Sequence, residues 1–443
     1  MKFEYIVEQL QDVPQIEVTV NNMKGIQTYS SRFKQTKQPP VQSIIIDSTH
    51  PFISMRKECA KLESKIGISS VCLCLTKIPN KYKFAFLTYA SKALYSFDKY
   101  LSNKSKNSQV IYIYSGHKRN DALREYTNQL NCASISRDLQ NEPANHISPD
   151  AFCKRVKSML KMYDTQVKVK ILNEKEMKKE ELNLVLAIGM SSKRMPRFMI
   201  IEYIHDPSLP TVCLIGKTVI FDAGGLSIKT KGMTPEMKTD KSGGSVVVGI
   251  MKHIVEFNNN HNVVAILPVV ENLLSEDVIR PGDIVKAHDG RTVEITNTDA
   301  EGRLIMADAI SYSHKYNPTY IIDLATLTGW AEGVHMDISA VCYCRDMKLA
   351  SLLNDAGEHV GERVWFLPNW DEYTEYTKSK IANVRNYSSD YREGAYLPSM
   401  FLLTFVPEHL RDRYIHIDIC NNFIGDLAKG NCVALVVELL KHL

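Results

Sequence analysis

Two short segments carry acidic and basic side chains at a spacing that could hold metal ions. The first runs from Gly216 to Lys229 and is followed by an acid eleven residues later, and the second is Asn297-Thr-Asp-Ala-Glu-Gly-Arg303. Four acids at the ends of neighbouring strands would repel one another, and divalent cations relieve that repulsion. The pattern predicts a site for two divalent ions about 3.5–4 Å apart that share carboxylate ligands. The residues of this predicted site are Lys217, Asp222, Lys229, Asp240, Asp299, Glu301 and Arg303.

Each of these residues also has an ordinary structural explanation when it is taken singly. An acid can cap a helix or lie solvated in a loop, and Lys229 and Arg303 can be surface charges or ion-pair partners. As functional groups, the two cations would polarise a carbonyl and stabilise a developing oxyanion. Lys217 could bind a metal only as a neutral amine, so its pKa would have to be lowered by the ions and by burial. A carboxylate-rich set favours Mg²⁺, Mn²⁺ or Zn²⁺ over Cu⁺.

Other catalytic motifs are absent from the sequence. Gly216-Lys217-Thr218 has the end of a phosphate-binding loop, but that motif needs a glycine where Thr211 stands, so we reject it. The chain contains no His-Glu-x-x-His, which excludes a helical zinc-protease site of that type. It also contains no Gly-x-Ser-x-Gly, which argues against a serine-hydrolase elbow.

The elements that must position these residues follow an alternating strand and helix pattern. In the first ~130 residues, apolar runs predict strands at 41–47, 70–75 and 109–114, with helices at 56–66 and 120–130. Further along, Ser148 and Pro149 predict a helix start as N-cap and first helical residue. We expect later strands at 167–171, 198–203, 212–221, 263–269, 293–296 and 320–324, and helices at 241–258 and 304–315.

This pattern predicts an α/β protein of two domains. We expect a smaller N-terminal α/β domain at residues 1–134, a linker helix region at 135–165, and a larger domain at 166–443 with a mixed, largely parallel sheet. Ligands bind at the carboxyl ends of strands in such sheets, which is where both charged segments stand.

The composition is that of an ordinary globular chain. Of 443 residues, 44% are hydrophobic and 23% charged, which excludes a mostly disordered or fibrous protein. The net charge of +4 is small for this length, so a nucleic-acid partner is possible but not indicated. We expect no membrane span, no secretory signal peptide and reduced cysteines, and therefore a cytoplasmic protein.

The charged segments closely resemble the leucyl (cytosol) aminopeptidases, a family of dinuclear metallo-exopeptidases. The heptapeptide from Asn297 to Arg303 matches that family's signature and is very specific. The resemblance covers residues ~135 to ~425 and includes Arg137-Asp-Leu, Asn141-Glu-Pro-Ala-Asn145, Glu271-Asn272, Arg280-Pro-Gly-Asp283, Asp323-Leu-Ala-Thr-Leu-Thr-Gly329 and His416-Ile-Asp-Ile419. It implies that the N-terminal domain is variable and macro-like and that the larger domain is the catalytic one.

The resemblance implies a complete two-metal site. Asp222, Asp299 and Glu301 would hold one ion, and Lys217, Asp222, Asp240 and Glu301 would hold the other. A water bridging the two ions would attack the scissile carbonyl. Arg303 would hold a bicarbonate that serves as general base, and Lys229 would help to stabilise the oxyanion. The ions would be Zn²⁺, Mn²⁺ or Mg²⁺, two per subunit.

The resemblance also implies a substrate and an assembly. The chain would release N-terminal residues, preferably leucine or other bulky apolar ones, from peptides, and would form a homohexamer. Two alternative functions stay open. One is a dinuclear hydrolase that cleaves another bond, such as a phosphoester. The other is a catalytically altered hexameric scaffold or nucleic-acid-binding protein of the same fold. The implied substrate-binding positions are Met237, Asn297, Thr326, Gly329, Cys420 and Phe423.

Several positions depart from the family pattern. Lys241 stands where the family has Met, Trp330 where it has a small residue, and Asn383 where it has Asp. Cys420-Asn421 replaces a common Ala-Gly pair. None of these changes removes a predicted metal ligand, but Trp330 and Cys420-Asn421 could reshape the substrate pocket.

Overall fold

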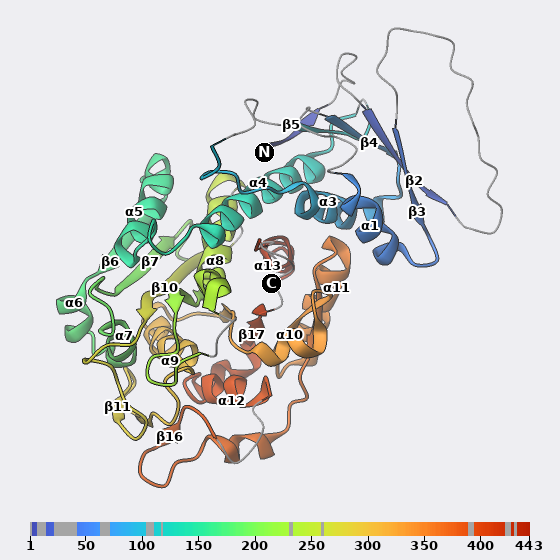
Figure 1. Ribbon diagram of the computed structural model, residues 1–443. Helices are drawn as coiled ribbons and strands as arrows, with labels where there is room; N and C mark the ends of the chain where they lie inside the picture. Colours follow the sequence, from blue (N-terminus) through green and yellow to red (C-terminus); the bar gives the residue numbers. More distant parts are fainter. Residues whose placement is uncertain are drawn as a thin grey trace, which may run out of the picture.

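The protein is a two-part α/β molecule, seen in a computed structural model (Figure 1). The structure describes residues 2–6, 15–21, 42–62, 71–102, 110–116, 118–229, 234–257, 261–388, 394–420, 427–428 and 432–443. In Figure 1 a smaller N-terminal unit, drawn in blue, lies to one side of a larger unit that runs from green to red. Among the described helices, none combines the length and the apolar character that crossing a membrane requires.

The N-terminal unit is built on a five-stranded parallel sheet. The strands predicted at 41–47, 70–75 and 109–114 are confirmed, and two strands that we did not predict join them. The helix predicted at 56–66 is confirmed in part as α1, which begins earlier, at Pro51, because proline is well tolerated at the first helical position. Helix α1 ends at Ala60, and residues 63–66 lie outside the described part of the chain. In sheet order the strands are β1 (Lys2–Ile6), β5 (Val110–Tyr114), β4 (Val71–Lys77), β2 (Gln15–Asn21) and β3 (Gln42–Asp47), with helices α1 (Pro51–Ala60) and α3 (Asn80–Leu94).

A long helix, α4 (Asp121–Asn141), connects the two units. Its N-cap Asn120 accepts a hydrogen bond from the amide of Leu123 at 3.0 Å. It continues well past the predicted end at 130, and its second half is buried against α8 (Ser242–Phe257). Helix α5 (Pro149–Leu160) then begins as predicted, with Ser148 as its N-cap. The predicted boundary at 134/135 falls inside α4, and the three-part division of the chain stays a prediction.

The larger unit has a nine-stranded mixed sheet with a parallel centre, as predicted. Strands β13, β8 and β10 run parallel at its middle, and antiparallel pairs lie towards both ends. The order is β15 (Arg363–Phe366), β14 (Ser339–Cys344), β17 (Tyr414–Asp418), β13 (Tyr320–Ala325), β8 (Thr211–Gly216), β10 (Asn262–Asn272), β7 (Arg197–Tyr203) and β6 (Val167–Leu172), with β9 (Thr218–Asp222) pairing with β10.

Helices cover both faces of this sheet, so its central strands are buried throughout. Every residue of β10 is buried, and its side chains alternate between two apolar clusters. One cluster includes α5, α8 and the helices α11 (Met347–Val360) and α13 (Val433–Leu440), and it continues into the core of the N-terminal unit. The other includes α7 (Asn183–Gly189), α9 (Glu301–Ser313) and α12 (Tyr396–Thr404).

Shorter elements complete the larger unit. A three-stranded sheet carries the loop that leads into α9. The remaining elements are α6 (Glu174–Lys179), α10 (Gly329–His335), β11 (Ile284–Lys286), β12 (Thr292–Glu294), β16 (Val384–Arg385), and the 3₁₀ turns η1 (Lys161–Tyr163), η2 (Thr234–Thr239), η3 (His314–Tyr316), η4 (Asp371–Thr377) and η5 (Glu408–Arg413).

The single strand predicted at 212–221 is wrong, because the chain breaks at Lys217 into β8 and β9. The backbone amide of Lys217 donates to the carbonyl of Leu324 at 3.0 Å, and its carbonyl accepts from the amide of Gly244 at 2.8 Å. Helix α8 can approach Lys217 this closely because Gly244 has no side chain. The break therefore places Lys217 at the meeting point of β8, β13 and α8.

Candidate metal centre

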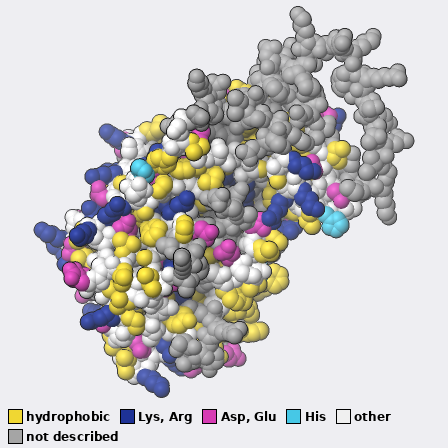
Figure 2. Space-filling view, in the orientation of Figure 1, with side chains coloured by type: hydrophobic (Ala, Val, Ile, Leu, Met, Phe, Trp, Pro, Cys, Tyr) yellow, Lys and Arg dark blue, Asp and Glu magenta, His cyan; other side chains and the backbone are white. Residues whose placement is uncertain are grey.

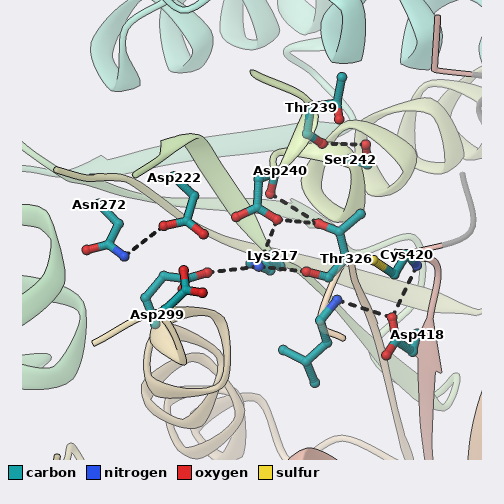
Figure 3. Close-up of polar contacts among 12 residues, drawn as sticks. Lys217, Asp222, Thr239, Asp240, Ser242, Asn272, Asp299, Thr326, Asp418 and Cys420 are labelled. Carbon is teal, nitrogen blue, oxygen red and sulfur yellow. Dashed lines mark hydrogen bonds and ion pairs between the residues drawn. The ribbon is translucent and has the colours of Figure 1, made fainter. Parts of the chain in front are cut away.

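The five predicted metal ligands come from separate elements and meet at one end of the large sheet. Lys217 lies at the break between β8 and β9, and Asp222 is the last residue of β9. Asp240 follows η2 just before α8. Asp299 lies in the loop after β12, and Glu301 is the first residue of α9. Figure 3 shows the labelled members of this set turned towards one another.

The amine of Lys217 lies between two of the acids. Its Nζ is 2.8 Å from Asp240 Oδ1 and 2.9 Å from Glu301 Oε1, and it donates to the carbonyl of Thr326 at 2.6 Å. Burial by itself lowers the pKa of this amine, but the carboxylates of Asp240 and Glu301 outweigh burial and raise the pKa above its usual range. The amine is therefore charged in this arrangement, and binding a metal through it would release a proton.

The amine of Lys229 links two other acids. Its Nζ is 2.8 Å from Asp222 Oδ2 and 2.5 Å from Asp299 Oδ1. Burial and the neighbouring Glu301 raise the pKa of Asp299 to about 7. Oxygen atoms of Asp222, Asp299 and Glu301 all lie within 4.8 Å of one another, which is a spacing that one metal ion could span.

Two carboxylate oxygens of the cluster are buried without a hydrogen-bond partner among the described residues. They are Oδ2 of Asp240 and Oε2 of Glu301. Burial raises the pKa of Asp240 to about 8, although the Lys217 amine opposes this shift. A buried carboxylate oxygen without a donor is costly, and a divalent cation would satisfy it. The donor set therefore fits divalent metal ions.

The loop that carries Asp222 turns through two glycines. Gly224 and Gly225 have φ angles of 90° and 61°, in the left-handed region that favours glycine. This turn lets the amide of Gly224 donate to Asp222 Oδ1 at 2.9 Å. Asn272 donates to the same oxygen at 2.8 Å. The sequence analysis named Asn272 only as part of the family pattern and gave it no place in the site, although it stands at the end of β10, where the strand-end rule could have found it.

Arg303 lies in the first turn of α9 with its guanidinium buried. Its Nη1 donates to the carbonyl of Asn386 at 2.6 Å. The side chain of Asn386 holds the preceding loop, because its Oδ1 accepts from the amide of Thr296 and its Nδ2 donates to the carbonyl of Asn297. Asn297 in turn accepts from the amide of Asp299 at 2.8 Å. Asn386 is a second residue that sequence reasoning missed.

The predicted substrate-binding residues lie at different places around the cluster. Thr326 is inside it, with its hydroxyl 2.7 Å from Asp240 Oδ1. Cys420 lies beside it, and its backbone amide donates to Asp418 at 3.1 Å (Figure 3). Met237 is half-buried in η2, and Gly329 begins α10. Phe423 and the neighbouring Asn421 lie outside the described residues. Contact of these side chains with a substrate stays a prediction.

Three of the residues that depart from the family pattern have defined contacts with their neighbours. Lys241 is fully buried, and its Nζ donates to the carbonyls of Glu142 and Lys238. Burial lowers the pKa of Lys241 to about 7. Asn383 uses only its amide oxygen, which accepts from the amide and hydroxyl of Thr292 at 2.8 Å each, so a carboxylate is not needed there. Trp330 is partly exposed and lies against the ring of Tyr396.

The chain is similar to known proteins in both sequence and fold. The model of the cytosol aminopeptidase family, catalytic domain, matches residues 134–436. A probable cytosol aminopeptidase of Roseiflexus castenholzii is 39% identical over 65% of the chain, and one of Rickettsia canadensis is 34% identical over 84%. The chain spans 58% and 77% of their lengths, respectively. A crystal structure of the Coxiella burnetii cytosol aminopeptidase superposes with a TM-score of 0.82 and 26% identity, covering 99% of both chains.

Proposed function

Because the chain belongs to the cytosol aminopeptidase family, whose members hydrolyse peptide bonds, we propose that it is a two-metal aminopeptidase. It releases N-terminal amino acids from peptides, preferably leucine or other bulky apolar residues. The observation that carries this proposal is the meeting of four acids and Lys217 at one sheet end, where buried carboxylate oxygens have no hydrogen-bond donor within the described part of the chain.

The ligands divide into two overlapping sets. Lys217, Asp222, Asp240 and Glu301 would hold one ion, and Asp222, Asp299 and Glu301 would hold the other. When bound, Zn²⁺, Mn²⁺ or Mg²⁺ ions would activate a water molecule at neutral pH and polarise the scissile carbonyl. The spacing of the three clustered carboxylates supports the second set.

The two remaining cations are proposed to act on the reacting groups. The pKa of Lys229 is raised by the carboxylates of Asp222 and Glu301, which outweigh its burial, so the side chain is a charged donor at neutral pH. It would donate to the carbonyl oxygen as negative charge develops there. Arg303 would hold a bicarbonate ion through its buried guanidinium and so keep a proton acceptor beside the attacking water.

The substrate preference is proposed from the residues beside Asp240. Met237, Gly329 and Cys420 are proposed to form an apolar lining, which would suit a leucine side chain. Burial raises the pKa of the Cys420 thiol well above its usual range, so this side chain contributes as a small apolar group rather than as a nucleophile.

We further propose that the protein is a cytoplasmic homohexamer of chains divided at 1–134, 135–165 and 166–443. The structure has one surface that supports assembly, here called the apolar patch, at α10 and the edge strand β15. Each of its four side chains is more than half exposed, and such clusters on a surface mark contacts between chains. The patch consists of Val334, Met336, Ile338 and Trp365.

The nucleic-acid alternative receives no support from the charges on the face shown in Figure 2. On the face in Figure 2, Lys and Arg side chains are interspersed with Asp and Glu rather than gathered in a stripe. A nucleic-acid surface needs a concentration of positive charge.

The experiment that tests the proposal uses metal-depleted protein in bicarbonate buffer. Mn²⁺, Zn²⁺ or Mg²⁺ is added back, and hydrolysis of leucine p-nitroanilide is followed beside its N-acetylated form and p-nitrophenyl phosphate. We expect metal-dependent release only from the free-amine substrate. Release from the acetylated substrate would contradict an aminopeptidase, and release from the phosphate ester would favour another hydrolase. Metal binding without any turnover would favour the scaffold alternative.

A further inference from the structure

Asn272 contacts both loops of the metal centre, the one that follows β9 and the one that leads into α9, and it does not belong to the predicted ligand set. It ends β10 and is 2% exposed. Its Nδ2 donates to Asp222 Oδ1 at 2.8 Å and to the carbonyl of Thr298 at 3.1 Å. Its backbone carbonyl accepts from the amide of Ala223 at 2.8 Å. One residue therefore ties the exit of β9 to the loop that leads into α9.

The two carboxylate oxygens of Asp222 have different partners. Oδ1 receives two donors from the protein, the amide of Gly224 and the side chain of Asn272. Oδ2 is the oxygen that faces a cation, the amine of Lys229 at 2.8 Å. The terminal torsion of an aspartate is broad, so a carboxylate without such donors rotates freely. The two donors set which oxygen turns towards positive charge.

The neighbouring Thr298 strengthens the same junction. Its hydroxyl donates to the carbonyl of Gly224 at 2.7 Å and accepts from the amide of Ser227 at 2.8 Å. The amide of Thr298 donates back to the hydroxyl of Ser227 at 3.2 Å. The two loops are thus joined by several hydrogen bonds, and Asn272 adds one that ends on a carboxylate of the centre.

We infer that Asn272 is a positioning residue of the metal centre, whose amide orients Asp222 and fixes its distance from the loop that carries Asp299 and Glu301. The inference rests on the proposed two-metal function. Groups that hydrogen-bond metal ligands hold them in their binding orientation, and their loss weakens metal affinity without removing a ligand. The Nδ2 atom of Asn272 faces Asp222, and its amide oxygen is turned the other way (Figure 3), so the effect of Asn272 on the ions acts through Asp222.

The chain offers a matched control at the other end of the same strand. Asn262 begins β10 and is also 2% exposed. Its Oδ1 accepts from the amides of His205 and Asp206, and its Nδ2 donates to the carbonyls of Asp206 and Leu209. Replacing either asparagine removes a buried amide with backbone hydrogen bonds, but only Asn272 touches the metal centre. A difference between the two variants therefore reports positioning rather than general stability.

The experiment titrates Mn²⁺ into metal-depleted full-length protein by isothermal calorimetry, together with urea denaturation of each variant. We expect Asn272→Ala to bind Mn²⁺ about 10–100-fold more weakly than the unaltered chain. Asn262→Ala should bind within about twofold of the unaltered chain, although both variants unfold at lower urea. Should Asn272→Ala fail to fold, Asn272→Ser replaces it as the milder change, with the same expected direction.

The outcomes separate this inference from the proposed function. Unaltered Mn²⁺ affinity in Asn272→Ala, beside an unaltered chain that binds Mn²⁺ and hydrolyses leucine p-nitroanilide, overturns the positioning role alone. Equally weakened Mn²⁺ binding in Asn262→Ala also overturns it, because the loss of affinity would then result from a less stable fold. An unaltered chain that binds no Mn²⁺ overturns both.

Discussion

Glu301 is the carboxylate on which the centre depends most, because it belongs to both proposed ligand sets. Burial by itself raises its pKa, but the amines of Lys217 and Lys229 outweigh burial and lower it, so the side chain is ionised in the folded protein. Its Oε1 faces Lys217, and its Oε2 has no hydrogen-bond partner among the described side chains. Oε1 is therefore held by the Lys217 amine, and Oε2 is available to a metal ion.

We therefore expect Glu301→Gln to lose metal binding while the fold survives. The amide keeps the shape and can still accept from Lys217, but it removes the shared negative charge. The predicted loss of leucine p-nitroanilide hydrolysis is at least about 10³-fold, comparable to losing a group that stabilises the transition state. Calorimetry with Mn²⁺ and far-ultraviolet circular dichroism would measure binding and fold. Glu294→Gln, on β12 outside the centre, is the control, and wild-type activity in Glu301→Gln would disprove the ligand assignment.

Charged residues were predictable at this scale, and the amides that orient them were not. Asp299, Glu301 and Arg303 are conspicuous in sequence because their charges cluster after an expected strand. Asn272 and Asn386 are not conspicuous, because an asparagine in a loop or strand end is most often a turn or cap residue. Their roles depend on which backbone groups approach them in space, which only the structure provides.

Helix α8 requires glycine where it approaches the sheet at Lys217. A Cβ atom built at Gly243 overlaps the carbonyl oxygen of Leu324 and lies 2.9 Å from the amide of Lys217. That same carbonyl accepts the Lys217 amide hydrogen bond at 3.0 Å. A methyl group there would push the helix away from the break between β8 and β9, and with it the start of α8 next to Asp240.

We expect Gly243→Ala to lower the free energy of unfolding by about 3 kcal/mol or more, because the obstructing atoms are backbone and cannot move aside cheaply. Urea denaturation would measure the change. Gly333→Ala is the matched control, since nothing lies within 4 Å of the added atom and alanine is about 0.8–1.0 kcal/mol better than glycine inside a helix. Similar values for the two variants would show that the close approach of α8 is not needed.

Helix α13 is attached by a carboxylate whose ionisation depends on pH. Glu438 Oε1 lies 2.7 Å from His359 Nδ1 of α11, and its Oε2 lies 3.2 Å from Lys441 Nζ. Burial by itself raises the pKa of Glu438, but the hydrogen bond with His359 and the charge of Lys441 outweigh it and lower the pKa to about 2. Because the folded pKa is below the unfolded one, the ionised form stabilises the fold above about pH 4.5.

Glu438→Gln should therefore cost about 2–3 kcal/mol of unfolding free energy at neutral pH. The difference between the variant and the unaltered chain should shrink as the pH falls from about 4.5 towards 2, where the glutamate is protonated. Urea denaturation of both proteins at a series of pH values would measure it. A difference that stays constant down to pH 3 would rule out the ionised pair as its source.

Helices and strands were predicted well where apolar residues recur at a clear period. They were predicted less well where contacts with distant segments decide where an element begins or ends. Residues 212–221 form one apolar run, and nothing in that run marks the break, because Lys217 leaves the strand ladder only to meet Leu324 and Gly244. Helix α4 was predicted too short because its second half carries polar residues such as Gln140, which are buried against α8 rather than exposed.

For the molecule as a whole, the fold class was predictable and the joining of the two units was not. The alternating pattern sufficed for two α/β units and a mixed sheet. The shared core arises from contacts between distant segments, such as the ring of Phe84 in α3 against His359 in α11 and the Arg363 guanidinium over Phe52 in α1. Ion pairing of Arg56 with Asp337 joins the units close to the apolar patch.

Assembly is the property of the whole molecule that the apolar patch makes testable. Trp365 lies on the edge strand β15, and its ring centroid is 5.8 Å from that of His335, the last residue of α10. Ile338 lies three residues after His335, and its side chain is also more than half exposed. Edge strands and exposed apolar clusters invite pairing with another chain. We expect the unaltered protein to sediment with a mass close to that of six chains.

Trp365→Glu and Ile338→Glu should each reduce that mass, because a carboxylate buried in an interface without a partner costs several kcal/mol. Neither position belongs to the metal centre, so Mn²⁺ binding per chain should stay the same. Sedimentation velocity over a range of protein concentrations would measure the assembly, and calorimetry the binding. Met162→Glu is the control, because Met162 is 76% exposed on η1 at a distance in sequence from the patch. Smaller assemblies in the control alone would place the contact between chains on another surface.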